Sequence, residues 1–406
     1  MGRAVGPAAF QCSDRLGAAR TKIRLLFDAN SGFLLRSPKY MTIPLRVGIV
    51  GSGYISAAYL KAAKHFSEFA AVACADALHE NAERRGEEFG LKAETVDELL
   101  HDESVDIILN LTTPQSHFEI TSKALEAGKH VYSEKPLTLS LEEAETLVKL
   151  GREHNVRLGC APDTFLGGGL QTVRKLVDDG AIGKPVGGTA FIMSGGPESW
   201  HPNPQFYYQK GGGPVFDMGP YYITALINLF GPIKQVTSIG RRSLESRVFG
   251  AGPNKGGTFP VEILTHFNAL LEFEQGPVIS FHASFDVPGH THLPIEIYGT
   301  EGSLQVPDPN TFGGPVRLLE KGGKWNDVPL THGFGDGNYR SLGVAEMAAA
   351  IRANRQHRAA EDLVTHTVEI MEAIVNGGET GQPISITTRC ERPRALQPLT
   401  RLGLLD

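Results

Sequence analysis

The fold is decided by one stretch, Val47-Gly48-Ile49-Val50-Gly51-Ser52-Gly53-Tyr54-Ile55-Ser56, near the start of the chain. An apolar run ends in closely spaced glycines and passes into a helical sequence, which is the pattern of a strand-turn-helix unit that binds a dinucleotide. The amides of Gly53, Tyr54 and Ile55 would face a pyrophosphate at the positive end of that helix. Because the third position of the fingerprint is Ser56 instead of glycine, the stretch alone also fits an incidental tight turn.

Asp76 closes the second expected strand, at roughly the 20-residue spacing of the acidic residue that follows such a turn. Its carboxylate can accept hydrogen bonds from an adenosine ribose and repel a 2′-phosphate, which favours NAD over NADP. The alternative is that Asp76 caps the next helix. Arg84 and Arg85 lie too far along that helix to form a clear phosphate-binding pair.

The pattern outside this stretch predicts two domains. Between residues 41 and 162, short β-rich runs alternate with helical stretches, which is typical of an α/β Rossmann domain with a doubly wound parallel sheet. Residues 163–390 contain one helix and then strands separated by glycine and proline turns. They predict an α+β domain with a large open, mainly antiparallel sheet, whose uncovered face would form a homodimer or homotetramer.

The chain ends are predicted separately. Helical spacing at 343–354 and 363–376 indicates two C-terminal helices that could pack back on the first domain, before a tail at 391–406. Residues 1–40 carry several arginines and few acids, which weakly resembles an organelle transit segment. An upstream or misassigned start is preferred, because Met41 comes just before the first strand, and we expect this segment to be poorly ordered.

Composition and charge argue against several classes of protein. The 406 residues include 39 Lys and Arg against 45 Asp and Glu, a net charge of −6, with no long basic run, so no nucleic-acid partner is expected. No apolar run approaches the roughly 18 residues of a membrane span, and we expect a cytoplasmic protein that acts on a small molecule. The cysteines, Cys12, Cys74, Cys160 and Cys390, lie far apart, which predicts reduced thiols.

Three further motifs are more specific: Leu111-Thr112-Thr113-Pro114 with His117, the run from Ala124 to Val131, and Glu134-Lys135-Pro136. Together with the glycine turn they resemble the glucose-fructose oxidoreductase, inositol dehydrogenase and rhizopine-catabolism family of nicotinamide-dependent oxidoreductases. The resemblance runs from about Leu45 to Ile386. It implies that Thr112, Pro114, His117 and Glu134 line the cofactor site, with substrate held over the nicotinamide between the two domains. Lys135 takes the place of the active-site lysine, before a proline that is often cis in this family.

The other half of the expected site lies in the stretch from Gly211 to Tyr221, which opens an apolar helix. Asp217 and Tyr221 are four residues apart, so a helix places them on one face. Many relatives have His at the place of Tyr221. With Tyr at this position, the sequence resembles the branch of the family that contains glucose-fructose oxidoreductase and dimeric dihydrodiol dehydrogenase. In that branch a Tyr is taken as the acid-base group.

The resulting hypothesis is that Tyr221, assisted by Lys135, removes a hydroxyl proton while hydride leaves the same carbon for NAD. A tyrosine pKa near 10 needs a nearby cation to favour the phenolate, and Lys135 could supply it. In the alternative, Tyr221 is a packing residue and Asp217 caps its helix. The substrate is expected to be a sugar, polyol or related hydroxy compound. The alternatives are an NADP-preferring dihydrodiol- or imine-type reductase and a non-catalytic dinucleotide-binding regulator.

Substrate contacts are expected from residues near the domain junction and before the glycine run: Asp163, Phe165, Trp200, His201 and Tyr207. Aromatic faces and hydrogen-bonding groups of this kind suit a sugar-like ligand. A metal site is not expected, because His282, His290 and His292 have no obvious carboxylate partner and fit surface or packing positions.

Overall fold

The first sheet of the protein is parallel and has six strands, in the order β3-β2-β1-β4-β5-β6. The structure, a computed structural model, describes residues 43–398 and 405. The strands are β1 (Leu45–Val50), β2 (Phe69–Ala75), β3 (Lys92–Glu94), β4 (Ile107–Asn110), β5 (His130–Ser133) and β6 (Leu158–Cys160). The intervening helices are α1 (Tyr54–Ala63), α2 (His79–Phe89), α3 (Val96–His101), α4 (Pro114–Glu126) and α5 (Leu141–Glu153).

This arrangement is the predicted doubly wound sheet. All four residues of β4 are buried, as expected when both faces of a parallel sheet are covered. The order reverses beside β1, where β2 lies on one side and β4 on the other. Ligands of open α/β sheets bind at such a reversal, at the carboxyl ends of the strands. The short β3 and α3 were not predicted, because three strand residues and a six-residue helix carry too little periodicity to recognise.

The second sheet has nine strands in the order β16-β15-β14-β13-β7-β12-β11-β8-β17. They are β7 (Pro185–Met193), β8 (Ile233–Arg241), β11 (His266–Phe273), β12 (Val278–Ser284), β13 (Ile295–Gly299), β14 (Gly302–Val306), β15 (Val316–Glu320), β16 (Trp325–Val328) and β17 (Ile384–Ser385). Neighbouring strands are antiparallel except β7 and β12, which are parallel. The mainly antiparallel sheet of the prediction is therefore confirmed, with one parallel pair at its centre.

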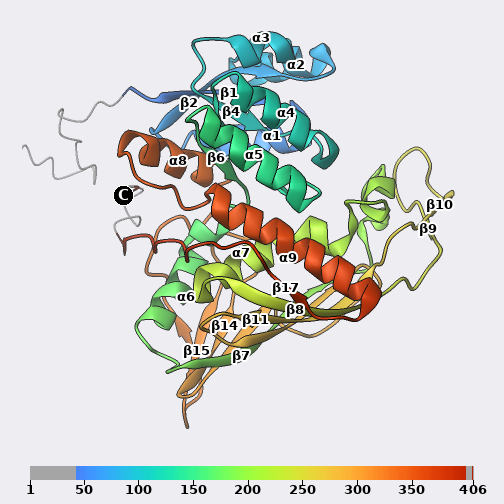
Figure 1. Cartoon of the computed structure of the whole chain (residues 1–406), viewed down its shortest axis with the longest axis vertical. Helices are drawn as coiled ribbons and strands as arrows, with labels where there is room; N and C mark the ends of the chain where they lie inside the picture. The colour runs from blue at the N-terminus through green and yellow to red at the C-terminus, as the bar shows by residue number, and fades with distance from the viewer. Residues whose placement is uncertain (1–42, 399–404, 406) are drawn as a thin grey trace, which may run out of the picture. The chain divides into compact units, whose positions relative to one another are not determined.

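Helices cover one face of this second sheet. These are α6 (Gly168–Asp178), α7 (Gly213–Phe230) and α9 (Glu361–Thr380), which contact its strands and lie together on one side of it in Figure 1. Burial alternates along β11, as expected for a strand with one covered face. Two short strands, β9 (Ser246–Val248) and β10 (Thr258–Pro260), pair outside the sheet.

The C-terminal segment joins the two sheets. Helix α8 (Leu342–Arg352) begins where Asp163 accepts hydrogen bonds from the amides of Ser341 and Gly343, at 3.1 and 3.0 Å. The Ser341 hydroxyl donates to the carbonyl of Tyr59 on α1, at 3.0 Å. Helix α9 contacts both α5 and β8. Helix α8 contacts β2 and β6 of the first sheet, and α9 contacts β6 of the first sheet as well as β8 and β11 of the second.

The expected tail is packed where the structure describes it. Leu396 is buried, and its amide donates to the side chain of Gln171 on α6 at 2.9 Å. The expectations for residues 1–40 and for Cys12 lie outside the described residues. Cys74, Cys160 and Cys390 are buried free thiols. Among residues 43–398, none of the helices is both long and apolar enough to cross a membrane.

Candidate active site

One cavity of about 750 Å³ brings the candidate cofactor and catalytic residues together. It lies at the carboxyl ends of β1, β4 and β5, next to the amino end of α7. Its lining includes every residue predicted for the cofactor: Gly51, Gly53, Tyr54, Ile55, Asp76, Thr112, Pro114, His117, Glu134 and Lys135. Asp217, Tyr221 and Tyr207 line it from the second half of the chain.

The glycine turn fits a dinucleotide. Gly51 has a φ of +101°, and a Cβ there would lie 2.5 Å from the carbonyl of Leu111 on the neighbouring strand, so only glycine is accommodated. A Cβ on Gly53 would meet nothing within 4 Å, which leaves the turn open on that side. Helix α1 begins with no side-chain cap and no acidic residue in its first turn. Its first amides are therefore available to an anionic group.

Ser56 explains why the fingerprint tolerates a third residue other than glycine. Its side chain is buried, and its hydroxyl donates to the carbonyl of Gly53 at 2.7 Å. The extra polar atom is thus satisfied within the turn itself.

Asp76 lines the cavity and also anchors the neighbouring backbone. Its carboxylate accepts hydrogen bonds from the amide of Ser52 at 2.8 Å and from the amide of Leu78 at 3.0 Å. Asp76 thus binds the amide of Leu78, the residue before α2, but does not cap that helix, whose first turn has no side-chain cap. Its contact with a ribose stays a prediction. The Arg85 guanidinium donates a hydrogen bond to the carbonyl of Gly53 at 2.9 Å. The Arg84 guanidinium donates one to the side chain of Asn81 at 3.0 Å. Neither arginine lines the cavity.

Lys135 is held in place at the end of β5. The Glu134 carboxylate accepts a hydrogen bond from the Lys135 amide at 2.8 Å and another from the Tyr59 hydroxyl at 2.8 Å. The Lys135-Pro136 bond is cis. The Lys135 ammonium donates to the backbone carbonyl of Asp217 at 2.5 Å and to its carboxylate at 3.0 Å. A residue of the first sheet is thus bonded directly to the helix that carries Tyr221.

Tyr221 lies beside that ammonium. The Lys135 Nζ is 5.2 Å from the centroid of the Tyr221 ring, within the range of a cation-π interaction. The Tyr221 side chain is buried, and the guanidinium of Arg340 interacts with its hydroxyl. The sequence reading missed Arg340, since no motif surrounds it. It is positioned by the side chain of Asn310, which accepts its hydrogen bond at 2.7 Å.

Burial and charge set the protonation of these groups. Burial would lower the pKa of Lys135, but the charge and hydrogen bond of Asp217, together with Tyr221 and Glu134, outweigh this effect and hold that pKa above its ordinary value. Burial raises the pKa of Tyr221, while the positive charges of Lys135 and Arg340 oppose this rise. Near neutral pH the site therefore holds a charged ammonium and a neutral phenol.

His117 stabilises two loops of the site. Its Nδ1 lies 2.6 Å from the carbonyl of Pro136, and its Nε2 lies 3.1 Å from the carbonyl of Thr112. Burial lowers the pKa of His117, and the two carbonyl contacts oppose this effect, since each is a hydrogen bond only when the nitrogen that faces it carries a proton. His117 thus links the loop after β4 to the loop after β5.

The expected substrate residues are placed unevenly. Tyr207 lines the cavity. Asp163 and Phe165 do not, because both are buried elsewhere. The Asp163 carboxylate instead accepts hydrogen bonds from the backbone amides at the start of α8. Trp200 lines a smaller, neighbouring cavity. His201 lines neither and meets the rings of Trp200 and Tyr207 edge-on, each with centroids 5.4 Å apart.

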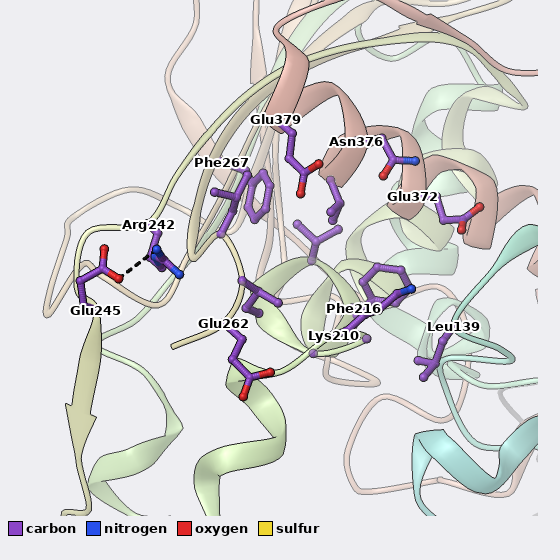
Figure 2. A pocket seen from close by; sticks show the side chains of 16 residues that line it. Leu139, Lys210, Phe216, Arg242, Glu245, Glu262, Phe267, Glu372, Asn376 and Glu379 are labelled. Carbon is purple, nitrogen blue, oxygen red and sulfur yellow. Dashed lines mark ion pairs between the residues drawn. The ribbon is translucent and has the colours of Figure 1, made fainter. Parts of the chain in front are cut away.

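A different cavity, of about 770 Å³, is shown in Figure 2. It shares Gly211, Gly212 and Phe216 with the candidate site, but none of the predicted site residues lines it. Its charged lining consists of Glu245, Glu262, Glu372, Glu379, Lys210 and Arg242. Arg242 is paired with Glu245 at 2.9 Å. Size alone therefore does not identify the redox site, because the smaller of these two cavities contains its chemistry.

The histidines at the end of β12 and beyond stack on an aromatic ring. Phe191 lies between His282 and His292, with centroid distances of 4.7 and 4.1 Å. Within residues 43–398, no group of three or more His, Cys, Asp or Glu side chains is arranged to hold a metal ion.

Comparison with known proteins assigns the family. Residues 45–161 match the model of the oxidoreductase family with an NAD-binding Rossmann fold, and residues 170–305 match the GFO/IDH/MocA C-terminal domain. The chain is 26% identical to 1,5-anhydro-D-fructose reductase of Ensifer adhaerens, over 74% of this chain and 85% of the relative. It is 25% identical to the NAD(+)-dependent scyllo-inositol 2-dehydrogenase of Bacillus subtilis (strain 168), over 78% and 89% of the two chains.

A solved structure shows the same fold. Levoglucosan dehydrogenase, in complex with NADH and L-sorbose, superposes with a TM-score of 0.71 at 21% identity, covering 85% of this chain and 99% of that one. Both halves of the chain, and the two-sheet architecture that they form, thus lead to one assignment. The protein is an oxidoreductase that belongs to the GFO/IDH/MocA family.

Proposed function

We propose that this protein is an NAD-dependent dehydrogenase or reductase that acts on a CH–OH group of a sugar, polyol or related hydroxy compound. The observation that carries the proposal is the meeting of Lys135, Asp217 and Tyr221 in the cavity that also contains the glycine turn. The relatives named above reduce an anhydrosugar or oxidise an inositol, according to their names, and both substrates are polyhydroxylated. The same chemistry is proposed for this chain.

The residues would share the reaction as follows. The glycine turn and the loops after β4 and β5 would hold NAD, which would supply the hydride acceptor for the carbon that bears the hydroxyl. Lys135 remains charged, since Asp217 raises its pKa, and stabilises the negative charge that develops on the substrate oxygen. Tyr221 exchanges the proton with that oxygen: its phenol donates during reduction, and its phenolate accepts during oxidation. Lys135 and Arg340 favour the phenolate against the effect of burial on the pKa of Tyr221.

NAD is proposed over NADP because of Asp76. Its carboxylate lines the cavity near the glycine turn, while Arg84 and Arg85 are turned to other partners. A 2′-phosphate beside this carboxylate would be repelled. The alternative is a reductase that prefers NADP, and measuring turnover with NAD and with NADP distinguishes the two.

The test is a screen of sugars, inositols and sugar acids for NADH formation, followed by a comparison of NAD with NADP. We expect turnover with at least one class of polyol, and a preference for NAD that falls roughly tenfold or more in Asp76→Ala. Glu80→Ala serves as the control, because Glu80 is an exposed carboxylate in the first turn of α2 that does not line the cavity. Tight NAD binding without hydride transfer to any compound would instead favour a non-catalytic regulator.

A further inference from the structure

A smaller cavity of about 370 Å³ meets the candidate active site at Asp217. Asp217 lines both cavities, and its carboxylate accepts the hydrogen bond of Lys135 on the side of the larger one. Helix α7 continues this boundary, because Tyr221 faces the larger cavity and Tyr222 the smaller. The two cavities thus adjoin at Asp217, and a second group attached to a molecule beside Lys135 would reach the smaller cavity past this side chain.

The smaller cavity offers aromatic surfaces. Trp200 lines it with 64% of its surface exposed, although a ring of this size is usually more covered. Tyr222 and Phe285 line it as buried residues, so their ring positions are set by packing. Aromatic rings of this kind provide rigid contact area for flat or ring-shaped groups, at a low cost in conformational entropy.

The charges of the cavity exclude anions. Asp217 and Asp308 contribute carboxylates to its lining, and the residues that line it include neither lysine nor arginine. Lys135, on the far side of Asp217, is already bonded to that carboxylate. His290 is the one basic side chain of the lining, so a phosphate or carboxylate placed here would meet two carboxylates with no lysine or arginine to pair with, which is costly in a partly desolvated site.

We propose that this smaller cavity is a subsite for an uncharged glycosyl or aryl group attached to the reacting sugar. The substrate class is then a neutral glycoside or disaccharide, in contrast to a sugar phosphate or a glycoside of a sugar acid. This inference rests on the proposed function, because it requires the reacting carbon to lie beside Lys135.

Binding can be measured separately from catalysis, because the chain has two tryptophans, Trp200 and Trp325. Trp325 is half-buried on β16 and lines neither cavity, so Trp325→Phe leaves Trp200 as the sole fluorescent reporter. The probes are the phenyl glycosides of glucose, galactose, mannose and xylose, with the matching 4-carboxyphenyl glycosides as anionic counterparts that carry their charge on the group in the smaller cavity. We expect at least one neutral phenyl glycoside to change the fluorescence in the presence of NADH, which cannot oxidise it, and the anionic counterparts to have no effect at equal concentration. An unchanged signal with every neutral glycoside, or an equal response to the anionic ones, would overturn the proposal.

Kinetics separates the subsite from the redox site. Trp200→Ala should raise the KM of the best phenyl glycoside roughly tenfold, and it should leave the KM of the parent monosaccharide unchanged. Asp308→Asn should relax the discrimination against the 4-carboxyphenyl glycoside. Trp325→Ala is the matched control and should change neither. If Trp200→Ala impairs the monosaccharide equally, the subsite is wrong while the redox function stands; if wild type turns over no sugar at all, the proposed function itself fails.

Discussion

At the scale of single residues, the site pairs a charged ammonium with a phenol whose pKa is raised by burial against the opposing effect of two cations. Lys135 is bonded to Asp217 through both the carbonyl and the carboxylate, so its ammonium is fixed in position as well as in charge. Tyr221 is buried between this ammonium and the guanidinium of Arg340. A proton that moves near neutral pH is therefore more easily exchanged by Tyr221 than by Lys135.

Tyr221→Phe removes the proposed proton carrier and keeps the ring against Lys135. We expect kcat to fall by about 100-fold to 10,000-fold, the usual contribution of a general acid or base, with little change in NAD affinity. Steady-state kinetics and NAD titration of the same preparation measure both quantities. An unchanged kcat would remove Tyr221 from the mechanism.

The pH dependence should have opposite signs in the two directions. Because burial raises the pKa of Tyr221, the phenol predominates at neutral pH. Oxidation, which needs the phenolate, should become faster as the pH rises toward that pKa, and reduction should become slower. The dependence of rate on pH should disappear in Tyr221→Phe, so the assignment of the titrating group to Tyr221 is checked by pH profiles of kcat/KM for wild type and variant. Identical profiles for the two would assign the titration to another group.

At the scale of elements, the site depends on how the C-terminal segment is fixed. Glu346 on α8 is fully buried, and its carboxylate accepts hydrogen bonds from Arg355 at 2.6 Å and from Arg358 at 2.7 Å. The amide of Arg358 donates to the same carboxylate at 2.9 Å. Since Arg340 comes directly before α8, the placement of this helix also places that guanidinium.

Glu346→Ala should destabilise the protein strongly. The change removes the buried carboxylate that Arg355 and Arg358 share, and breaking a buried ion pair costs about 3–5 kcal/mol. In contrast, Glu301→Ala breaks an exposed pair with Lys321 and should cost about 0–1 kcal/mol. Urea unfolding of both variants measures the difference. Similar midpoints for the two would show that α8 is held by its apolar packing alone.

The elements also show what sequence could and could not predict. The parallel sheet, the glycine turn and the helix carrying Asp217 were predictable, because periodicity and motif spacing are local properties. The role of Asp163 was not, since its partners at Ser341 and Gly343 are distant in sequence. Arg340 was missed for the same reason: only the fold brings it to Tyr221. Trp200 was recognised as an aromatic near a cleft, but the sequence did not indicate which cavity it lines.

At the scale of the whole molecule, the second sheet leaves apolar side chains uncovered. Ile239, Leu270, Val278 and Tyr298 lie on β8, β11, β12 and β13 with 53%, 49%, 43% and 36% of their surface exposed, at positions that alternate with buried ones. Several exposed apolar side chains on the uncovered face of a sheet suit a protein-protein contact. The expected homodimer or homotetramer would use this face.

Leu270→Lys should therefore weaken self-association. The substituted charge would be buried in a contact between copies and left without a partner. Val248→Lys provides the control, because Val248 is 53% exposed on β9, outside the nine-stranded sheet. Size-exclusion chromatography with light scattering should give an oligomer for wild type and Val248→Lys and a smaller species for Leu270→Lys. A monomeric wild type would contradict this use of the sheet.

The central claim is that the ammonium of Lys135 and the phenol of Tyr221 meet at the carbon that exchanges hydride. A crystal structure of the protein with NAD and the best substrate from the screen tests it most directly. We predict that the substrate oxygen lies within hydrogen-bonding distance, about 3 Å, of both groups, with the nicotinamide ring against the reacting carbon. A nicotinamide bound outside this cavity, or a substrate oxygen that contacts neither Lys135 nor Tyr221, would contradict the claim.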